Sequence, residues 1–233
     1  MKKLLAIFCV LAVFASTAVA APKKSKVKGS KIGVSMPTKD LQRWNQDGAN
    51  MKAQLEAAGY KVDLQYAAND IPTQVSQIEN MITGKCKVLV IAAIDGSALK
   101  NPLEQAKKKG IKVIAYDRLI MNTDAVSYYA TFDNYKVGTI QGEYLVDKLG
   151  LKDRTKKNPV YMELFTGDPG DNNINFFFGG AMDILNPYIE SGVIVVPSKQ
   201  TSKAQCATLN WSTEEAQKRM ENLITSNGYG PKG

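Results

Sequence analysis

Short apolar runs that alternate with amphipathic segments restrict the possible folds of this chain more than any other feature of its sequence. Residues 88–93 are almost wholly apolar, as expected of a central parallel strand covered on both faces. Further strands are predicted at residues 31–36, 62–66, 112–116 and 126–131, in alternation with helices. This alternation predicts an α/β fold built on a doubly wound parallel sheet with right-handed crossovers.

The helices between these strands have recognisable ends. The first has one apolar face and stops at Gly59. The second begins at Asp70, with Pro72 in its first turn, where a missing N–H is harmless. The third covers residues 97–109. Together these elements predict a first α/β lobe over residues 31–132.

A second series of elements occupies residues 133–233, which we expect to form a second lobe entered through one hinge crossing. The last helix of the series opens with Ser212 and Glu215, the spacing of a capping box. An independent α/β lobe commonly has about 100 to 150 residues and four or more strands. Only two strands are clear here, so we expect a partial lobe and a chain truncated at its C-terminus. Its helices are predicted at 134–149, 172–188 and 212–225, and its strands at 159–165 and 193–196.

The N-terminus has the pattern of a cleaved secretory signal. Two lysines precede an apolar run over residues 4–13, and a small-x-small cleavage site ends at Ala20. We therefore predict a signal peptide at residues 1–20, a basic flexible tail at residues 21–30, and export to the periplasm. No later run reaches the roughly 20 apolar residues of a membrane helix.

Composition disfavours several classes of function. The sequence contains no histidine, which excludes His-dependent catalytic triads, His metal ligands and His proton relays. The formal charge of +8 includes two lysines of the leader, and the basic clusters at residues 23–28 and 152–157 lack the interleaved aromatic residues typical of nucleic-acid binding. No Walker loop or Gly-x-Gly-x-x-Gly turn is present. We expect no enzyme activity, no metal, no cofactor and no nucleic-acid partner.

Two cysteines, Cys86 and Cys206, follow the leader. Export permits a disulfide. The two residues fall in different predicted lobes, where a bridge would fix a movable cleft. Free cysteine is often a small buried hydrophobe, so we expect free thiols.

Polar and aromatic residues collect where the predicted strands end. In an open α/β sheet, ligands bind outside the carboxyl ends of the strands. Carboxylate, amide and guanidinium groups pair with sugar hydroxyls in fixed geometry, and aromatic faces pack on the C–H groups of a sugar ring. The two tryptophans, one in each lobe, are predicted to stack on opposite faces of one pyranose. The candidate residues are Lys39, Arg43, Trp44, Asp117, Arg118, Asp171, Asn172, Asn173, Phe177 and Trp211.

Each of these signals also has a simpler interpretation. Trp44 begins an amphipathic helix and is equally compatible with ordinary core packing. Asp117 and Arg118 are compatible with a surface ion pair. The run of three phenylalanines at residues 176–178 favours packing beneath the loop over three ligand contacts. The joint placement at strand ends is what favours a binding site.

Several separate segments, in order along the chain, resemble the periplasmic sugar-binding proteins of the ribose, galactose and xylose type, and among them most closely the multiple-sugar-binding receptors. The similarity extends from about residue 31 to residue 225. It is carried by Met36-Pro-Thr-Lys39 with Arg43-Trp44, Asp63-Leu-Gln-Tyr-Ala67, Ile71-Pro-Thr-Gln74, Gln77-Ile-Glu-Asn-Met81, Lys87-Val-Leu-Val-Ile-Ala92 with Ile94-Asp-Gly96, Ile111-Lys-Val-Ile-Ala-Tyr-Asp-Arg-Leu-Ile120, Tyr128-Tyr-Ala-Thr-Phe-Asp-Asn134, Asp171-Asn-Asn173 with Phe176-Phe-Phe178, and Trp211.

This resemblance implies a two-lobed type I periplasmic binding protein that captures a monosaccharide, an aldose, between its lobes. A monomeric receptor of this kind presents the sugar to a membrane ABC permease and holds no cofactor. By similarity, the sugar hydroxyls are bound by Arg43, Asp117 and Arg118 from the first lobe and by Asp171 and Asn173 from the second, with Trp44 and Trp211 stacking on the ring. The hinge strands that return the chain between the lobes have no counterpart in this sequence, so we expect weak binding by the chain alone.

Two other functions stay open at this stage. One is a sugar-sensing partner of a chemoreceptor or sensor kinase, because the same closed form serves signalling and transport. The other is a secreted carbohydrate-active enzyme, for which Asp117 and Asp171 are the available carboxylates across the cleft. The secretory leader argues against a transcriptional repressor of the same fold.

Overall fold

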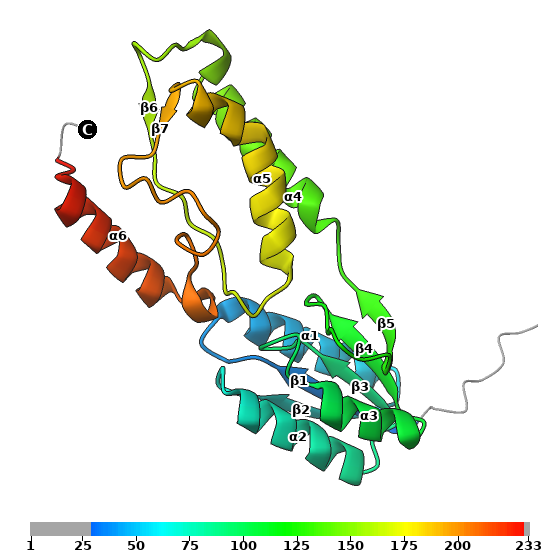
Figure 1. Ribbon diagram of the computed structural model, residues 1–233. Coiled ribbons are helices and arrows are strands. Elements are labelled where there is room, and N and C mark those ends of the chain that lie inside the picture. The colour runs from blue at the N-terminus through cyan, green and yellow to red at the C-terminus, as the bar shows by residue number, and fades with distance from the viewer. Residues whose placement is uncertain (1–28, 231–233) are drawn as a thin grey trace, which may run out of the picture.

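The computed structural model of the chain describes residues 29–230. The predicted signal peptide and most of the predicted basic tail lie outside these residues. The described part contains a five-stranded sheet and a two-stranded sheet, each with its own helices, and they form two separate bodies (Figure 1). We call them the first lobe and the second lobe. The chain passes between them at residues 131–133.

The first lobe is built on a parallel five-stranded sheet. Its strand order is β2-β1-β3-β4-β5, which is the doubly wound arrangement that the sequence predicts. The central position of β3 explains its nearly continuous apolar sequence, because both of its faces are covered. The strands are β1 (Lys31–Met36), β2 (Lys61–Tyr66), β3 (Val88–Ile91), β4 (Lys112–Tyr116) and β5 (Val126–Ala130).

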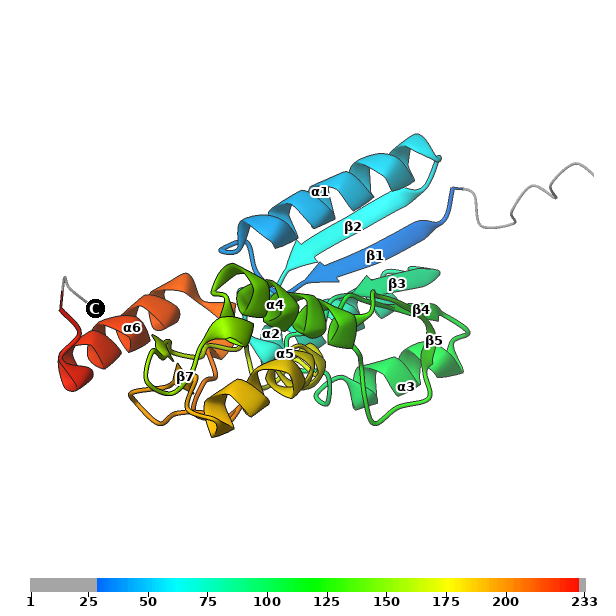
Figure 2. The ribbon, with the colours of Figure 1, turned by 90° about the horizontal axis from the view of Figure 1, so that it is seen from above.

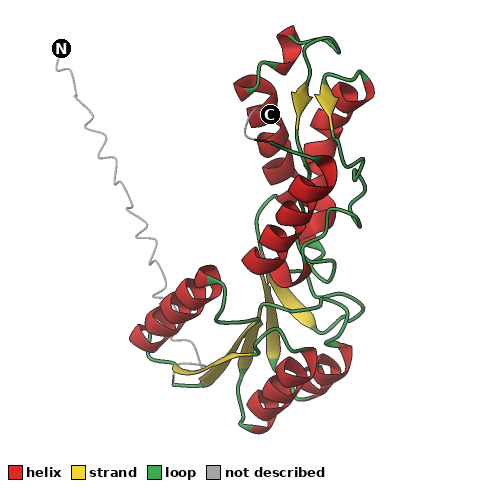
Figure 3. Cartoon of the chain, turned by 90° about the vertical axis from the view of Figure 1, so that its left-hand side faces the viewer, coloured by secondary structure: helices red, strands yellow, loops and turns green. Residues whose placement is uncertain are grey.

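Helices cover both faces of this sheet (Figures 2 and 3). Alternate residues of β3 face opposite sides: Leu89 and Ile91 pack in the core with α2 and α3, whereas Val90 packs on the other side with α1. The Asp70 side chain accepts a hydrogen bond from the N–H of Thr73 and so caps α2 as predicted. The helices are α1 (Gln42–Ala57), α2 (Ile71–Thr83) and α3 (Lys100–Lys108).

The second lobe contains two long helices in very close contact, α4 (Asn134–Lys148) and α5 (Asn173–Glu190). A Cβ atom added at Gly138 would lie 2.1 Å from the carbonyl oxygen of Phe177, and one added at Gly180 would lie 2.2 Å from that of Tyr135. The two helix backbones therefore approach each other through glycine, and the pair packs closely along its length.

The strands of the second lobe are shorter than predicted. β6 (Val160–Tyr161) and β7 (Ile194–Val195) form a two-stranded parallel sheet, whereas the sequence predicts strands at residues 159–165 and 193–196. Pairing needs a neighbour, and within the described residues each strand pairs only with the other. The lobe also contains 3-10 turns at Leu151–Asp153 and Leu209–Trp211 and a final helix, α6 (Thr213–Asn227). The predicted cap of α6 is present, since Ser212 accepts from the N–H of Glu215.

The two lobes have separate cores. Cys86 is a buried free thiol in the core of the first lobe, and Cys206 is a buried free thiol in the core of the second. Burial raises the pKa of both thiols, which keeps them in the unreactive protonated form. Among the residues that the structure describes, no helix has the length and apolar character needed to cross a membrane.

Candidate ligand site between the lobes

A cavity of about 350 Å³ lies where the two lobes meet. Eight of the ten predicted site residues line it, and they come from both lobes. Leu41 and Gln42 complete the wall; sequence reasoning missed them, although they adjoin Arg43 directly. The lining residues are Leu41, Gln42, Arg43, Trp44, Asp117, Arg118, Asp171, Asn173, Phe177 and Trp211.

Trp44 forms the floor of the cavity on the side of the first lobe. It is 3% exposed and belongs to the core beneath β1 and β3, so the core interpretation of this residue is correct as far as its packing is concerned. The guanidinium carbons of Arg43 and Arg118 lie 4.8 Å and 5.2 Å from the centre of its ring. Both cations are within the range of cation–π attraction, which fixes the position of their head groups.

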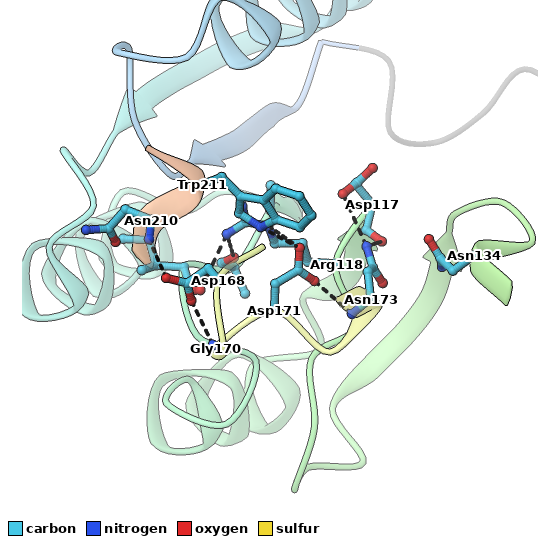
Figure 4. A network of polar contacts seen from close by, with 12 residues as sticks. Asp117, Arg118, Asn134, Asp168, Gly170, Asp171, Asn173, Asn210 and Trp211 are labelled. Atoms are coloured by element: carbon cyan, nitrogen blue, oxygen red, sulfur yellow. Dashed lines mark hydrogen bonds and ion pairs between the residues drawn. The ribbon is translucent and has the colours of Figure 1, made fainter. Parts of the chain in front are cut away.

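Asp117 follows β4 directly and is 5% exposed. Its carboxylate pairs with the guanidinium of Arg43 in the first turn of α1. From the second lobe, the amide nitrogen of Asn173 donates to the main-chain oxygen of Asp117 at 3.1 Å (Figure 4). Asp117 is therefore buried and bonded to both lobes, which excludes the surface ion pair considered for it from the sequence.

Arg118 reaches from the same loop to the carboxyl end of β3. Its Nη1 atom donates to the main-chain oxygen of Ala93 at 3.0 Å. Its Nε atom is buried and has no hydrogen-bond partner among the described residues, although it lies 3.2 Å from Oδ2 of Asp171. Burial lowers the pKa of Arg118, because a hydrated charge has been removed from water.

Asp171 faces Arg118 from the second lobe (Figure 4). Its carboxylate accepts from the N–H of Asn173 at 2.9 Å and from Nε1 of Trp211 at 3.2 Å. Burial raises the pKa of Asp171 despite these bonds and the opposite charge of Arg118. The carboxylate orients both the indole of Trp211 and the guanidinium of Arg118.

Trp211 is held by a short segment that sequence reasoning did not assign to the site. A Cβ added at Gly167 would lie 2.0 Å from the Trp211 ring, so the indole rests directly on the glycine backbone. Asn210 and Trp211 adopt left-handed backbone angles, φ 56° and 54°, and the carboxylate of Asp168 accepts from the N–H of Asn210. The ring of Phe177 meets Trp211 edge-on at 6.3 Å.

Two predicted residues lie outside the cavity. Lys39 is exposed, and its Nζ atom lies 5.2 Å from the centre of the Tyr66 ring. Asn172 precedes α5 and accepts a hydrogen bond from Asn175 at 3.0 Å. The structure thus gives Lys39 and Asn172 local partners away from the other eight residues.

The site combines two arginines with two carboxylates, so the formal charges of its ionic groups balance. Amide groups and three aromatic rings supply hydrogen bonds and apolar faces. Such a set suits a neutral ligand that carries many hydroxyl groups and some C–H surface. Within residues 29–230, no group of three or more acidic or cysteine side chains is arranged to hold a metal ion.

A larger cavity, about 450 Å³, lies inside the second lobe between α4, α5 and the segment after β6. Its lining is mainly apolar, and its one carboxylate, Glu163, is already bonded to Ser198 and Tyr229. This cavity lacks the converging polar groups that characterise the site between the lobes.

Comparison with known proteins identifies the family. Residues 32–233 match the model of the periplasmic binding protein domain. The chain is 55% identical over 195 residues to the multiple sugar-binding periplasmic protein SbpA of Azospirillum brasilense, which covers 84% of this chain and 54% of that protein. It is 53% identical over 216 residues to the multiple sugar-binding periplasmic receptor ChvE of Rhizobium radiobacter, covering 93% of this chain and 59% of that protein.

Among solved structures, an ABC transporter solute-binding protein from Clostridium phytofermentans with bound β-D-glucose is similar at a TM-score of 0.82 and 65% identity. That match covers 84% of this chain and 60% of the other. The chain therefore spans a little more than half the length of these relatives. Its sequence, its parallel first sheet and its matched residues agree, and the chain belongs to the family of the periplasmic binding protein domain.

Proposed function

We propose that this chain forms the sugar-capturing part of a periplasmic solute-binding receptor. Its ligand is a neutral aldose held between the two lobes. The observation that carries the proposal is the cavity at the lobe boundary, where the charges of two arginines and two carboxylates balance beside a tryptophan from each lobe.

The polar groups of the site support a hydroxyl-rich ligand. The guanidinium-bearing side chain of Arg118 lines the cavity from the first lobe. The Asp171 and Asn173 side chains stand beside it from the second lobe. A guanidinium and a carboxylate each bond two neighbouring hydroxyls, which are spaced on a sugar ring as these groups require. A charged solute would leave the site with a net charge, because the two ion pairs already balance.

The aromatic residues support a ring-shaped ligand. Trp211 and Phe177 line the cavity from the second lobe, and Trp44 lines it from the first. Aromatic faces pack on the C–H groups of a pyranose, and polar side chains at the rim bond its hydroxyls. The relatives whose names specify sugar binding, and the similar protein that holds β-D-glucose, support the same ligand class.

The partner follows from the same reasoning. When a receptor closes on a sugar, the two lobes together form one surface. A membrane ABC permease binds the closed receptor through that surface. The similar structure from Clostridium phytofermentans is an ABC transporter solute-binding protein, which supports transport as the role. The periplasm is the proposed location, in line with the names of the relatives.

Titration calorimetry over glucose, galactose, arabinose and xylose tests the proposal. We expect saturable but weak binding of at least one aldose by this chain, which spans a little more than half the length of its relatives, and a loss of that binding in Trp211→Ala. Lys39→Ala is the matched control, because this exposed side chain lies outside the cavity. The proposal would be contradicted if none of the four sugars bound measurably while amino acids or nucleosides showed saturable binding. Turnover of a chromogenic glycoside would instead favour the enzymatic alternative based on Asp117 and Asp171.

A further inference from the structure

Asp117 has an unusual backbone conformation for a residue at the centre of a binding site. Its φ angle is 64°, in the left-handed region that residues with a side chain rarely adopt. The carboxylate of Asp117 meets Arg43 at the cavity wall. Because the backbone conformation sets the direction of the Cα–Cβ bond, it also sets the direction in which this carboxylate points.

The main chain of Asp117 is held from several sides. Its N–H donates to the oxygen of Ala130 at 2.8 Å, which continues the pairing of β4 with β5. Its carbonyl oxygen accepts from Oγ1 of Thr131 at 3.1 Å and from Nδ2 of Asn173 at 3.1 Å. The hydroxyl of Tyr129 lies 3.2 Å from the same oxygen. A carbonyl oxygen has two lone pairs, so these three donors saturate it.

Two of the three donors come from the end of the first lobe: Tyr129 lies in β5, and Thr131 directly follows that strand, where the chain leaves the lobe. The hydroxyl of Thr131 also accepts from Nδ2 of Asn134 at 3.2 Å, which directs its own proton towards Asp117. The hydroxyl of Tyr129 lies within 3.4 Å of Oδ1 of Asn173. The hydrogen bonds thus extend from the crossing between the lobes to the ligand cavity.

We propose that Thr131 and Tyr129 are positioning residues of the sugar site. They hold Asp117 in its left-handed conformation and so direct its carboxylate towards the ligand. Asn173 donates to the same carbonyl oxygen from the second lobe. Neither residue lines the cavity, so they act through Asp117 and do not contact the sugar. A strained conformation persists where surrounding contacts over-determine it, which is the arrangement seen at this carbonyl. The inference rests on the proposed function.

Sugar titration of Thr131→Val, Thr131→Ser and Tyr129→Phe tests the inference. Thr131→Val keeps the shape and removes the hydroxyl; we expect affinity to fall about threefold to tenfold, the effect of one lost hydrogen bond. Thr131→Ser keeps the hydroxyl and should retain most of the affinity. Tyr128→Phe is the matched control for Tyr129→Phe, because Tyr128 is 64% exposed on the same strand. Wild-type affinity in both Thr131→Val and Tyr129→Phe would overturn the inference.

A second measurement reports on Asp117 without any ligand. The ¹³C resonance of the Asp117 carbonyl, observed with selective labelling, should shift in Thr131→Val and stay in place in Tyr128→Phe. In an Asp117→Ala background, Thr131→Val should lower affinity less than twofold, because the side chain being positioned is absent. An unmoved resonance in Thr131→Val would overturn the inference. If the wild-type protein binds no sugar while the resonance still moves in Thr131→Val, the proposed function is refuted and the contact that holds Asp117 is established.

Discussion

Arg118 Nε lies 3.2 Å from Asp171 Oδ2, and this contact joins the two lobes beside the cavity. The side chains are 7% and 4% exposed. Burial lowers the pKa of the arginine and raises the pKa of the aspartate, so the loss of hydration outweighs the attraction between the two charges. Such a pair gains from every further hydrogen bond, and sugar hydroxyls would supply them.

Replacing Arg118 should therefore weaken sugar binding more than replacing Lys39. Arg118→Ala leaves Asp171 and the sugar hydroxyls without a charged donor, and a lost hydrogen bond to a charged group costs about 1.5–3 kcal/mol, or roughly tenfold to hundredfold in affinity. Arg118→Lys keeps the charge but loses the planar fork, so we expect an intermediate loss. Calorimetry measures the sugar affinity of each variant, and only variants that keep the wild-type melting temperature are compared. Equal, small losses for Arg118→Ala and Lys39→Ala would contradict the role of Arg118.

Sugar should also compact the protein. The lobes already touch directly, since the N–H of Gly96 donates to the oxygen of Gly170 at 3.2 Å in addition to the contact of Arg118 with Asp171. A ligand that bonds both lobes binds the closed arrangement better than an open one and shifts the population towards it. Small-angle scattering with and without saturating sugar should show a smaller radius of gyration with sugar. An unchanged radius would refute closure as the mechanism.

The carboxylate of Glu163 should make stability depend on pH at acid values. Burial alone would raise its pKa, but hydrogen bonds from Ser198 and Tyr229 hold the pKa below its ordinary value. Stability from such a group is complete above the unfolded-state pKa, about 4.3, and is lost as the pH falls through the lower folded-state value. The difference in melting temperature between wild type and Glu163→Gln should therefore shrink below about pH 4. Glu221→Gln, on the exposed side of α6, is the matched control for the substitution itself.

The contact between α4 and α5 should be intolerant of a single methyl group. A Cβ at Gly138 would lie 2.1 Å from a backbone oxygen, which can move only if the helices separate. Overpacking of this kind costs about 1–3 kcal/mol, so Gly138→Ala should lower the melting temperature by several degrees. Gly179→Ala on α5 is the control, because a Cβ there would have no neighbour within 4 Å. A melting temperature for Gly138→Ala at or above that of Gly179→Ala would show that the helices separate freely.

Local rules predict most of the first lobe and most of the site. The apolar runs and helix ends determine the parallel sheet, and a parallel sheet brings its carboxyl ends together, so Arg43, Asp117 and Arg118 meet there. The length of the strands in the second lobe could not be predicted in this way. An apolar pattern identifies a segment that is able to pair, but the partner that determines its paired length is not local.

Three parts of the site depend on contacts between residues far apart in the sequence. Lys39 has the right chemistry and the right strand end, yet its side chain turns towards Tyr66. Thr131 acts through the carbonyl of Asp117, fourteen positions earlier. Gly167 matters because it has no side chain, and the ring of Trp211, a residue in a left-handed turn, lies directly on it. No periodicity or motif marks such a position.

Gly167→Ala should therefore weaken sugar binding through Trp211. The new methyl group would lie 2.0 Å from the indole, so the ring must tilt away from its place beside Asp171 and Phe177. In a Trp44→Phe background, Trp211 is the remaining tryptophan, and its fluorescence should shift in Gly167→Ala because its surroundings change. Gly179→Ala serves again as the control for adding a methyl group.

The loss of affinity in Gly167→Ala should be similar for all aldoses that bind. Stacking holds the ring of the sugar and not its individual hydroxyls, so the variant should lower each affinity by a similar factor. A loss confined to one aldose would mean that Gly167 shapes a hydroxyl pocket and not the stacking face.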